Sequence, residues 1–457
     1  MQRVCAAQHN KPARHPGVRR TVLIAALLAL IPAAGAAAAP RPNLLVVMTD
    51  DQRADGTMTM MPETRRRIGR QGTTFLQAHA TTPKCCPSRA SFFTGLYPHN
   101  HGVIGNTHAS ALDHGRTVQR LVKRNGYRTG IFGKFLNGWP VEQNPPFFDE
   151  WATTNGGYDS AYWNLDGRIG RKYRYTTDLI ADRAVRFVRR AERRDDQPWL
   201  AWVTPYAPHL PSKPPRRDRA APLPPFAATA AMTETDWSDK PDFLDRARGY
   251  QEGIDTMRED GRRSLIAVDD MVARLLDELR ARGEDENTLV VFTSDNGFLL
   301  GEHGGLAHKD LPYLPSTQIP LLVRWPGHAA RGRESHRPVT NVDVATTLLA
   351  AAGVRSRTDG RSLFATQRRE ELFMEHHGGS NGEPDALPLP PWRSLLTRRY
   401  RYTEYYERDR PATLEYYDHG IDPWELQNRA AELAPERVAE LSARLAAYAR
   451  CRGRSCP

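Results

Sequence analysis

Short runs of branched apolar residues recur along the chain, and each ends abruptly in polar residues. Four such runs span residues 44–48, 128–132, 199–204 and 289–293. Continuous apolar runs of this length are typical of strands buried on both faces of a parallel sheet. Residues 262–282 instead have apolar side chains at spacings of three and four, which predicts an amphipathic helix. The pattern predicts an α/β fold, with a large, mixed, mostly parallel sheet covered by helices on both faces.

The C-terminal part of the chain has a different pattern. An alanine-rich segment at 342–352 predicts a helix, and a polar stretch follows at 355–369. The remainder is typical of a small antiparallel sheet closed by a helix at 435–450. We therefore expect an α/β domain at residues 40–355 and a smaller C-terminal α+β subdomain, antiparallel sheet plus helix, at 356–457. A segment rich in proline and arginine from 208 to about 225, irregular as far as 241, is expected to cross the surface near the mouth of the site.

Residues 1–39 have the form of a signal peptide. Arg19 and Arg20 precede an apolar run at 22–34, and small residues lead to Pro40. The apolar run is shorter than the roughly 20 residues that span a bilayer, so we expect export and removal of the leader rather than a stable membrane span. The arginine pair also fits twin-arginine export. The mature protein is expected to be periplasmic, secreted or extracellular.

The charge balance is modestly basic. The formal net charge of the chain is +11, and the predicted leader carries five basic side chains and no acidic one, which leaves +6 for the remainder. This charge is compatible with anionic substrates and equally with an ordinary basic surface. No basic run with interleaved aromatic residues occurs, so a nucleic-acid partner is not expected.

The chain has five cysteines, too few for a disulfide framework in a chain of 457 residues. Cys5 lies in the leader. Cys451 and Cys456 are five residues apart and can close a small loop in an oxidising compartment. Cys85 and Cys86 remain as candidates for chemistry.

Polar side chains of chemical interest follow all four apolar runs. They are Asp50 and Asp51, Lys134, His209, and Asp295 with Asn296. In open α/β sheets ligands bind at the carboxyl ends of the strands, where these residues would meet. Carboxylate and amide oxygens suit a hard cation such as calcium or magnesium better than zinc. Each feature also has an ordinary explanation, because acidic pairs cap helices and single lysines or histidines occupy solvated loops.

The most unusual segment is Cys85-Cys86-Pro87-Ser88-Arg89. Pro87 fits the first turn of a helix, and Arg89 would lie one turn after Cys85 on the same face. Cys85 would then stand at a helix N-terminus, where backbone amides favour an anion. Taken alone, these residues leave Cys85 either an activated thiolate or a buried apolar side chain.

This segment resembles the signature of the sulfatase family, formylglycine-dependent hydrolases of the alkaline phosphatase superfamily. Further segments that resemble sulfatase motifs follow in the expected order and extend the resemblance from residue 41 to about 428. They are Asp50-Asp51-Gln52, Gly133-Lys134, Pro208-His209, Ser294-Asp295-Asn296-Gly297, Gly301-Glu302-His303-Gly304 with Lys309, and Asp422-Pro423-Trp424-Glu425. Residues 85–103, 133–137 and 238–241 are most similar to N-acetylglucosamine-6-sulfatases and extracellular heparan sulfatases.

The resemblance implies an enzyme, a sulfuric ester hydrolase, acting on a sulfated sugar such as N-acetylglucosamine-6-sulfate, or on an aryl sulfate. Cys85 would be converted to formylglycine (3-oxoalanine) by a formylglycine-generating enzyme. Its hydrated diol would attack sulfur to give a covalent sulfo-enzyme intermediate, and the second hydroxyl would then expel sulfate. One divalent cation, with calcium favoured, would be held by modified Cys85 together with Asp50, Asp51, Asp295 and Asn296.

Other roles follow from the same resemblance. Arg89 would support the diol, Lys134 and Lys309 would neutralise the sulfate oxygens, and His209 would donate to the leaving oxygen. Asn137 and His303 are weaker candidates for substrate contact. Leu136 stands where many sulfatases have a histidine, so the base that releases sulfate is not assigned. Residues 312–317 lack the usual acidic residues, which leaves the placement of Lys309 open.

Two other functions fit the same residues. A phosphodiester or phosphonate monoester hydrolase of the same superfamily would use the same diol, cation and cationic side chains. Asn296 favours sulfate, because a site with fewer charged ligands suits the less charged group. A non-catalytic protein that binds sulfated glycans is the second alternative.

Overall fold

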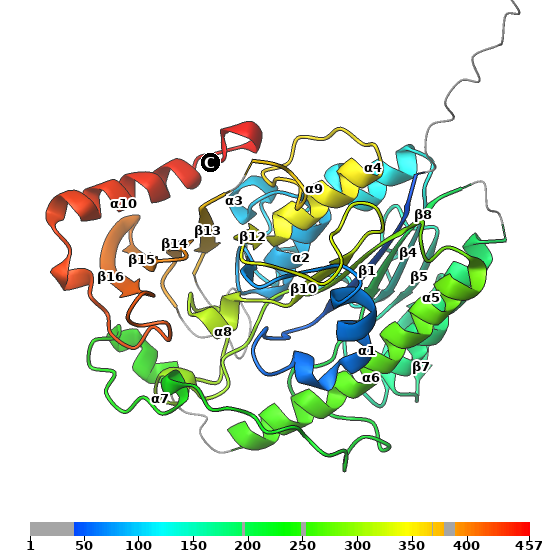
Figure 1. Ribbon diagram of the computed structural model, residues 1–457, viewed down its shortest axis with the longest axis horizontal. Helices are drawn as coiled ribbons and strands as arrows, with labels where there is room; N and C mark the ends of the chain where they lie inside the picture. Colours follow the sequence, from blue (N-terminus) through cyan, green and yellow to red (C-terminus); the bar gives the residue numbers. More distant parts are fainter. Residues whose placement is uncertain (1–40, 194–196, 248–252, 368, 379–388) are drawn as a thin grey trace, which may run out of the picture. The chain divides into compact units, whose positions relative to one another are not determined.

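The computed structural model describes residues 41–193, 197–247, 253–367, 369–378 and 389–457. The predicted signal peptide lies outside the described residues. Residues Arg41–Pro457 form one compact unit. It contains a ten-stranded sheet, a two-stranded sheet and a four-stranded sheet (Figure 1).

The ten-stranded sheet has the order β11-β2-β10-β9-β1-β8-β4-β5-β6-β7. Strands β9, β1, β8, β4 and β5 pair in parallel at its centre, and β10, β6 and β7 add antiparallel pairings toward its edges. The sheet is therefore mixed and mostly parallel, as predicted. The strands are β1 (Asn43–Thr49), β2 (Thr73–Phe75), β4 (Arg128–Gly133), β5 (Glu150–Thr153), β6 (Ala161–Leu165), β7 (Arg168–Lys172), β8 (Trp199–Thr204), β9 (Thr288–Ser294), β10 (Leu321–Arg324) and β11 (Arg333–Ser335).

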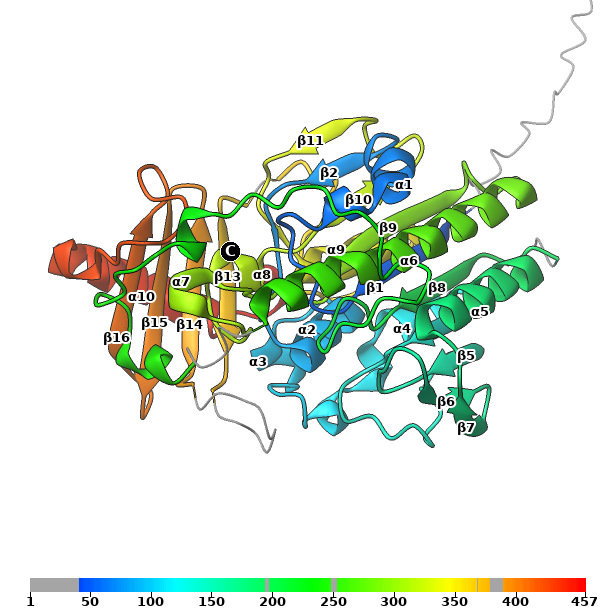
Figure 2. The same ribbon diagram turned by 90° about the horizontal axis from the view of Figure 1, so that it is seen from below.

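Helices cover both faces of this sheet (Figures 1 and 2). Leu44, Val46 and Met48 face one apolar core with α2, α4 and α9, whereas Leu45 and Val47 face a second core with α5 and α6. Both faces of β1 are thus buried, which explains its unbroken apolar sequence. These helices are α2 (Cys85–Thr94), α4 (Val118–Arg124), α5 (Thr176–Ala191), α6 (Ile254–Arg282) and α9 (Asn341–Ala351).

The four apolar runs predicted as strands are neighbours in the sheet. They form β9, β1, β8 and β4, in that order and all parallel. The register pairs Thr49 with Ser294, so Asp50 and Asp295 leave adjacent strands at the same level. Gly133 likewise pairs with Thr204 at the ends of β4 and β8. The carboxyl ends of the four strands therefore open onto one edge of the sheet.

The C-terminal part forms the predicted antiparallel sheet and helix. Strands β13 to β16 pair in sequence order, and α10 (Pro435–Tyr448) packs against them through Leu441 and Leu445. Cys451 and Cys456 form a disulfide bond, as their spacing suggested. The proposed division near residue 355 stays a prediction. The strands are β13 (Glu371–His376), β14 (Trp392–Thr397), β15 (Tyr400–Glu407) and β16 (Arg410–Asp418).

The remaining elements are short. Strands β3 (Ala78–His79) and β12 (Val339–Thr340) form the two-stranded sheet. The other α-helices are α1 (Pro62–Thr64), α3 (Pro98–His101), α7 (Glu302–Gly305) and α8 (Leu314–Thr317), and short 3₁₀ and π-helical segments occur between the larger elements. From residue 205 to 229 the chain has neither helix nor strand, in agreement with the predicted irregular excursion. Of the helices in the described part of the chain, none combines the length and apolar composition that a bilayer crossing requires.

Candidate active site

The strand ends bring the predicted acidic residues together. Asp50 and Asp51 follow β1, and Asp295 and Asn296 follow β9, its parallel neighbour. The backbone N–H of Asp51 donates to Asp295 Oδ1 at 3.0 Å, and Asn296 Nδ2 donates to Asp51 Oδ1 at 2.6 Å. All four side chains are buried. The sheet register therefore produces one compact group of oxygen atoms.

Asp51 adopts a left-handed backbone conformation with φ of 64°. Aspartate tolerates this region better than most residues. The turn is held by the Asp295 carboxylate and by Ser294 Oγ, which accepts the N–H of Gln52 at 2.9 Å. The chain thus bends at Asp51 and keeps both consecutive carboxylates beside β9.

Helix α2 begins at Cys85 and lies with all ten of its residues buried. Pro87 is in its first turn, and Gly95, with φ of 71°, ends it. Arg89 Nε donates to Asp295 Oδ2 at 2.7 Å, and its Nη1 donates to the Lys134 carbonyl at 2.8 Å. The arginine one turn after Cys85 therefore links the helix to the ends of β9 and β4.

The Cys85 sulfur faces the acidic group. Its Sγ lies 3.4 Å from Asp50 Oδ1 and 3.6 Å from Asp51 Oδ1, and Lys309 Nζ lies 2.7 Å away. Burial raises the pKa of the Cys85 thiol well above its usual value, although Lys134 and Lys309 act in the opposite direction. An unmodified Cys85 would therefore be a neutral thiol and a poor nucleophile at this position.

Two lysines pair with the two carboxylates. Lys134 Nζ lies 2.6 Å from Asp50 Oδ2, and Lys309 Nζ lies 2.6 Å from Asp51 Oδ1. Burial alone would raise the pKa of each carboxyl, but the neighbouring cations, Lys134 for Asp50 and Lys309 for Asp51, bring both below the ordinary value. Both carboxylates are therefore ionised and able to hold a cation.

The donor set fits a hard cation. Asp51 Oδ2 and Asn296 Oδ1 are buried and accept no hydrogen bond from any described residue. A buried oxygen without a partner costs about 1–3 kcal/mol, so a ligand for it is expected. Ligand atoms of Asp50, Asp51, Cys85 and His209 lie within 4.8 Å of one another. Asp295 adjoins this cluster through its bonds to Arg89 and to the Asp51 amide.

His209 presents one ring nitrogen to the site. Its Nδ1 lies 2.5 Å from the Leu210 carbonyl, which only accepts, so Nδ1 carries a proton. Its Nε2 lies 3.5 Å from Asp51 Oδ2. Tyr206 stacks on the imidazole with ring centroids 4.6 Å apart. The ring is therefore held with Nε2 toward the carboxylates, available to bind or donate a proton.

The amino-acid sequence of this chain matches a family model of known enzymes. The family model described as Sulfatase matches residues 42–354, about two thirds of the chain. The chain belongs to the sulfatase family. A second family model, the C-terminal region of N-sulphoglucosamine sulphohydrolase, matches residues 301–450.

Curated sulfatases align over much of the chain. An extracellular sulfatase Sulf-1 homolog of Caenorhabditis elegans is 31% identical over 385 residues, which cover 78% of this chain and 52% of the relative. The chain thus spans about half the length of that relative. The N-acetylglucosamine-6-sulfatase of Homo sapiens is 28% identical, with 92% of this chain and 87% of the relative covered.

Solved structures share the fold. A protein in complex with its substrate D-glucosamine-2-N,6-O-disulfate has a TM-score of 0.72 and 25% identity, with 88% of this chain and 97% of that chain covered. A phosphonate monoester hydrolase of Agrobacterium radiobacter has a TM-score of 0.69 and 21% identity, with 90% of this chain and 96% of that chain covered. The second likeness shows the fold alone.

Asn137 and His303, the weaker candidates for substrate contact in this sulfatase, make different contacts from those of the central cluster. The backbone carbonyl of Asn137 lies 3.6 Å from Cys86 Sγ, and the buried Asn137 Oδ1 accepts no hydrogen bond from the described residues. His303 is buried and pairs with Glu234 at 2.8 Å. Leu136, which replaces the histidine of many sulfatases, packs in the apolar core. His303 is thus engaged in a contact that does not involve the cluster.

Two features of the site were not predicted. Lys84, directly before Cys85, pairs with Asp310, directly after Lys309, at 2.8 Å, and both side chains are buried. The only signal in the sequence was their position beside predicted site residues. This ion pair between Lys84 and Asp310 joins the segment of Lys309 to the start of α2.

The stacking of Tyr206 on His209 was also not predicted, because an aromatic residue three positions before a histidine is not a specific sequence pattern.

Proposed function

We propose that the protein hydrolyses sulfate esters with a nucleophile made from Cys85. The observation that carries this proposal is the position of the Cys85 sulfur at the start of α2, within 3.4–3.6 Å of two carboxylates and 2.7 Å of a lysine. Because burial holds the plain thiol neutral, the position fits a modified side chain better than a thiolate. Formylglycine at this position supplies, when hydrated, one hydroxyl for attack and a second for release of sulfate.

The proposed cation ligands are Asp50, Asp51, Asp295, Asn296 and the modified Cys85 side chain. Hard oxygen donors favour calcium or magnesium, and the family resemblance favours calcium. When bound, the cation supplies positive charge that acidifies a neighbouring hydroxyl and attracts the sulfate group. The two buried oxygens without hydrogen-bond partners support this assignment.

Three cationic side chains would bind the anionic substrate. Lys309 pairs with Asp51 and lies 2.7 Å from the Cys85 sulfur, where it would contact a sulfate group. Lys134 pairs with Asp50, whose other carboxylate oxygen lies 3.4 Å from the same sulfur. Arg89 Nη2 is buried, donates no hydrogen bond to any described residue and lies 3.6 Å from Asp50 Oδ2. These side chains would stabilise the negative charge that develops in the transition state.

His209 is the proposed proton donor to the leaving alcohol. Its Nδ1 is fixed as a donor to a carbonyl, so a proton on Nε2 would point into the site. Asn137 is proposed as a weaker contact of the substrate, since its Oδ1 has no partner among the described residues. His303 is proposed as a weaker contact of the substrate, although its ring is already paired with Glu234.

The proposed substrate class is a sulfated sugar. Relatives named N-acetylglucosamine-6-sulfatase align over most of the chain, and the structure with D-glucosamine-2-N,6-O-disulfate has the same fold. The relatives described as extracellular support export of this protein, with residues 1–39 as the leader. Maturation would then require a formylglycine-generating enzyme as a partner.

The first test is mass spectrometry of the tryptic peptide 85–89 after co-expression with a formylglycine-generating enzyme. We expect an aldehyde at Cys85. An unmodified thiol in protein that nevertheless turns over sulfate esters would refute the proposed nucleophile. An unmodified, inactive protein that binds sulfated sugars would instead support the non-catalytic alternative.

A second test separates sulfate from phosphorus chemistry. The fold likeness to a phosphonate monoester hydrolase makes that activity the main competing function. Rates of sulfate, phosphate and phosphonate release from matched aryl esters would be compared with the same preparation. We expect kcat/KM to be highest for the sulfate ester, and a clearly faster phosphorus ester would overturn the assignment.

A further inference from the structure

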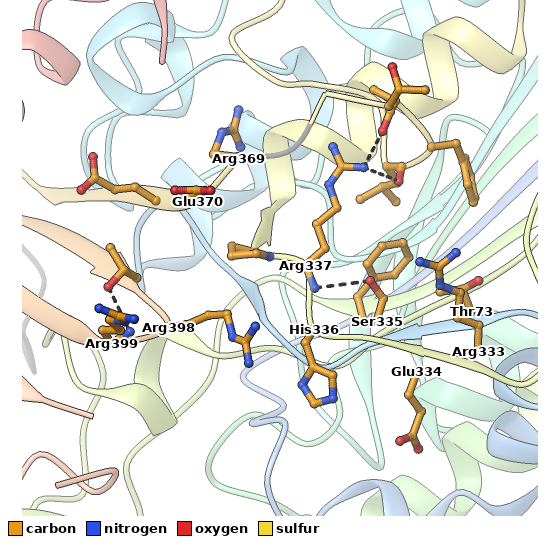
Figure 3. A pocket seen from close by; sticks show the side chains of 18 of the residues that line it. Thr73, Arg333, Glu334, Ser335, His336, Arg337, Arg369, Glu370, Arg398 and Arg399 are labelled. Atoms are coloured by element: carbon orange, nitrogen blue, oxygen red, sulfur yellow. Dashed lines mark hydrogen bonds between the residues drawn. The ribbon is translucent and has the colours of Figure 1, made fainter. Parts of the chain in front are cut away.

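A large cavity lies away from the candidate active site (Figure 3). Its volume is about 1060 Å³, at the upper end of the range of small-ligand sites. Its walls come from β2 and β11 on one side and from the start of β13 and the β14–β15 turn on the other, with α10 contributing side chains. None of the proposed catalytic or metal-binding residues lines it.

The walls of this cavity are strongly basic. Seven arginines and two histidines line it, against three glutamates. The arginines are Arg333, Arg337, Arg369, Arg398, Arg399, Arg437 and Arg444. An excess of positive charge in a concave surface attracts anions and raises their local concentration.

Four of these arginines serve the structure. Arg337 donates to backbone carbonyls of the 363–367 segment. The other three form ion pairs, Arg369 with Asp343, Arg437 with Glu440 and Arg444 with Glu371. Their charge is therefore largely compensated within the fold.

The other three arginines have no such role. Arg333, Arg398 and Arg399 are exposed, and their guanidinium groups make no ion pair or hydrogen bond with any described residue. Figure 3 shows Arg333 on one wall and Arg398 with Arg399 on the opposite wall. Such a pair of walls presents guanidinium groups to a ligand from two sides, and each matches the two oxygens of a carboxylate or sulfate.

We propose that this cavity is a second binding site for an extended, anionic sulfated oligosaccharide. The chemical identity of the ligand rests on the proposed function, since a sulfated glycan is the substrate class of the active site. The partly buried side chain of Phe364 also lines the walls and suits the face of a sugar ring. The site would hold a distant part of the chain whose sulfate ester is cleaved.

The sheet topology supports an extended ligand. Strands β2 and β11 run parallel to β9 and β1, because β10 pairs antiparallel with both β2 and β9. The residues after β11 therefore face the same edge of the sheet as Asp50 and Asp295. Strand β11 is four strands from β1, which corresponds to about 20 Å across the sheet. A single sugar unit does not extend across that distance, whereas an oligosaccharide does.

The acidic side chains in the walls favour a glycan over a nucleic acid. Glu334 and Glu370 are exposed beside the free arginines (Figure 3). Carboxylates accept hydrogen bonds from the free hydroxyl groups that a glycan carries along its chain, whereas the deoxyribose units within a DNA strand have no free hydroxyl. A chain with alternating hydroxyl and sulfate groups is the better match.

The test compares two triple variants of equal charge change. One carries Arg333→Ala, Arg398→Ala and Arg399→Ala. The control carries Arg168→Ala, Arg171→Ala and Lys172→Ala on β7, the exposed strand at the opposite edge of the same sheet. Both are made in a Cys85→Ala background, and binding of a heparin-derived decasaccharide is measured by calorimetry at two or more salt concentrations.

We expect Kd of the cavity variant to rise at least tenfold and that of the control less than twofold. The salt dependence of binding should also weaken in the cavity variant, because fewer counterions are displaced from the glycan. Equal effects of the two triple variants would overturn the site, as would absence of binding by the parent. Equal affinity for single-stranded DNA of the same charge would overturn the assignment to a glycan.

The active site is tested separately, with both triple variants in the Cys85-containing enzyme. We expect each to keep kcat/KM for a small aryl sulfate within twofold of the parent, since the cavity shares no residue with the catalytic group. Failure of the parent to hydrolyse any sulfate ester would refute the proposed function. The binding measurements would still show whether the cavity binds the oligosaccharide. A large loss of aryl sulfate turnover in the cavity variant alone would refute a separate site.

Discussion

The buried ion pair between Lys84 and Asp310 gives a quantitative prediction. Only 1% of the Lys84 side chain and 5% of the Asp310 side chain are exposed, with Nζ and Oδ2 2.8 Å apart. At an effective dielectric constant of about 20, this separation corresponds to an attraction of about 6 kcal/mol, much of it offset by the desolvation of both ions. Lys84→Met would leave the Asp310 carboxylate buried without its cation, at a cost of about 3–5 kcal/mol.

The loss of unfolding free energy is measured by urea unfolding, followed through tryptophan fluorescence. Thermal unfolding gives a second measure of the same loss. For a chain of 457 residues the unfolding entropy is roughly 1 kcal/mol per kelvin, so the thermal midpoint should fall by about 3–5 °C. The matched control is Lys123→Met, because Lys123 and Asp149 pair at 2.6 Å with about a third of each side chain exposed. That surface pair should contribute less than about 1 kcal/mol.

The pH dependence gives an independent check. Burial alone would raise the pKa of Asp310, but Lys84 brings it below its ordinary value. In the native protein this carboxyl stabilises the fold above its unfolded pKa, and the contribution is lost as the pH falls through the folded pKa. In Lys84→Met burial should raise that pKa, so the defect should be smaller at pH 5 than at pH 8.

The Lys84–Asp310 pair should also affect activity, because it helps to position Lys309 beside Cys85. Asp310 follows Lys309, whose Nζ lies 2.7 Å from the Cys85 sulfur, so we expect kcat to fall in Lys84→Met. The double variant Lys84→Met with Asp310→Asn should cost less stability than the two single variants together, because it removes both charges and leaves neither buried alone. A loss of stability no greater than that of Lys123→Met, or full additivity in the double variant, would refute this reasoning.

Three further predictions concern the active site. Cys85→Ala should abolish sulfate release while Cys86→Ser, whose Sγ lies 3.6 Å from the Asn137 carbonyl, keeps much of it; the reverse pattern in a turnover assay would contradict the proposed nucleophile. His209→Gln should reduce kcat by about 100-fold or more for esters with a basic alcohol and by much less for an acidic phenol, and equal losses would argue against proton donation. Chelation with EGTA should remove activity and lower the thermal midpoint by about 3 °C at a cation concentration 100-fold above Kd, with both restored by calcium; a calorimetric midpoint that does not move would contradict the cation site.

Much of the fold was readable from local sequence patterns. The runs that form β1, β4, β8 and β9 were predicted to within one residue at each end, because the middle of a strand buried on both faces is rich in apolar residues. Pro87 predicted the start of α2 correctly. Helix α6 begins at Ile254 rather than near 262, since its first turns are mostly polar and lack the apolar spacing.

The candidate site was predicted as a set of residues rather than as an arrangement. Family resemblance selected Cys85, Arg89 and the strand-end residues, and the structure brings them together. Their roles stay predictions for experiment. His303 was also selected from its motif, but its pairing with Glu234 depends on a distant segment of the chain that no local pattern identifies.

The sequence by itself determined which segments are strands and helices and which residues carry reactive groups, because apolar periodicity and side-chain chemistry are local properties. Only the tertiary structure decided the order β9-β1-β8-β4, the turn at Asp51 and the burial of the Lys84–Asp310 pair. It also decided which arginines are neutralised and which stay exposed in the basic cavity. The sequence does not distinguish an arginine that forms an ion pair from one that stays exposed, because its partner is set by packing between segments far apart in the chain.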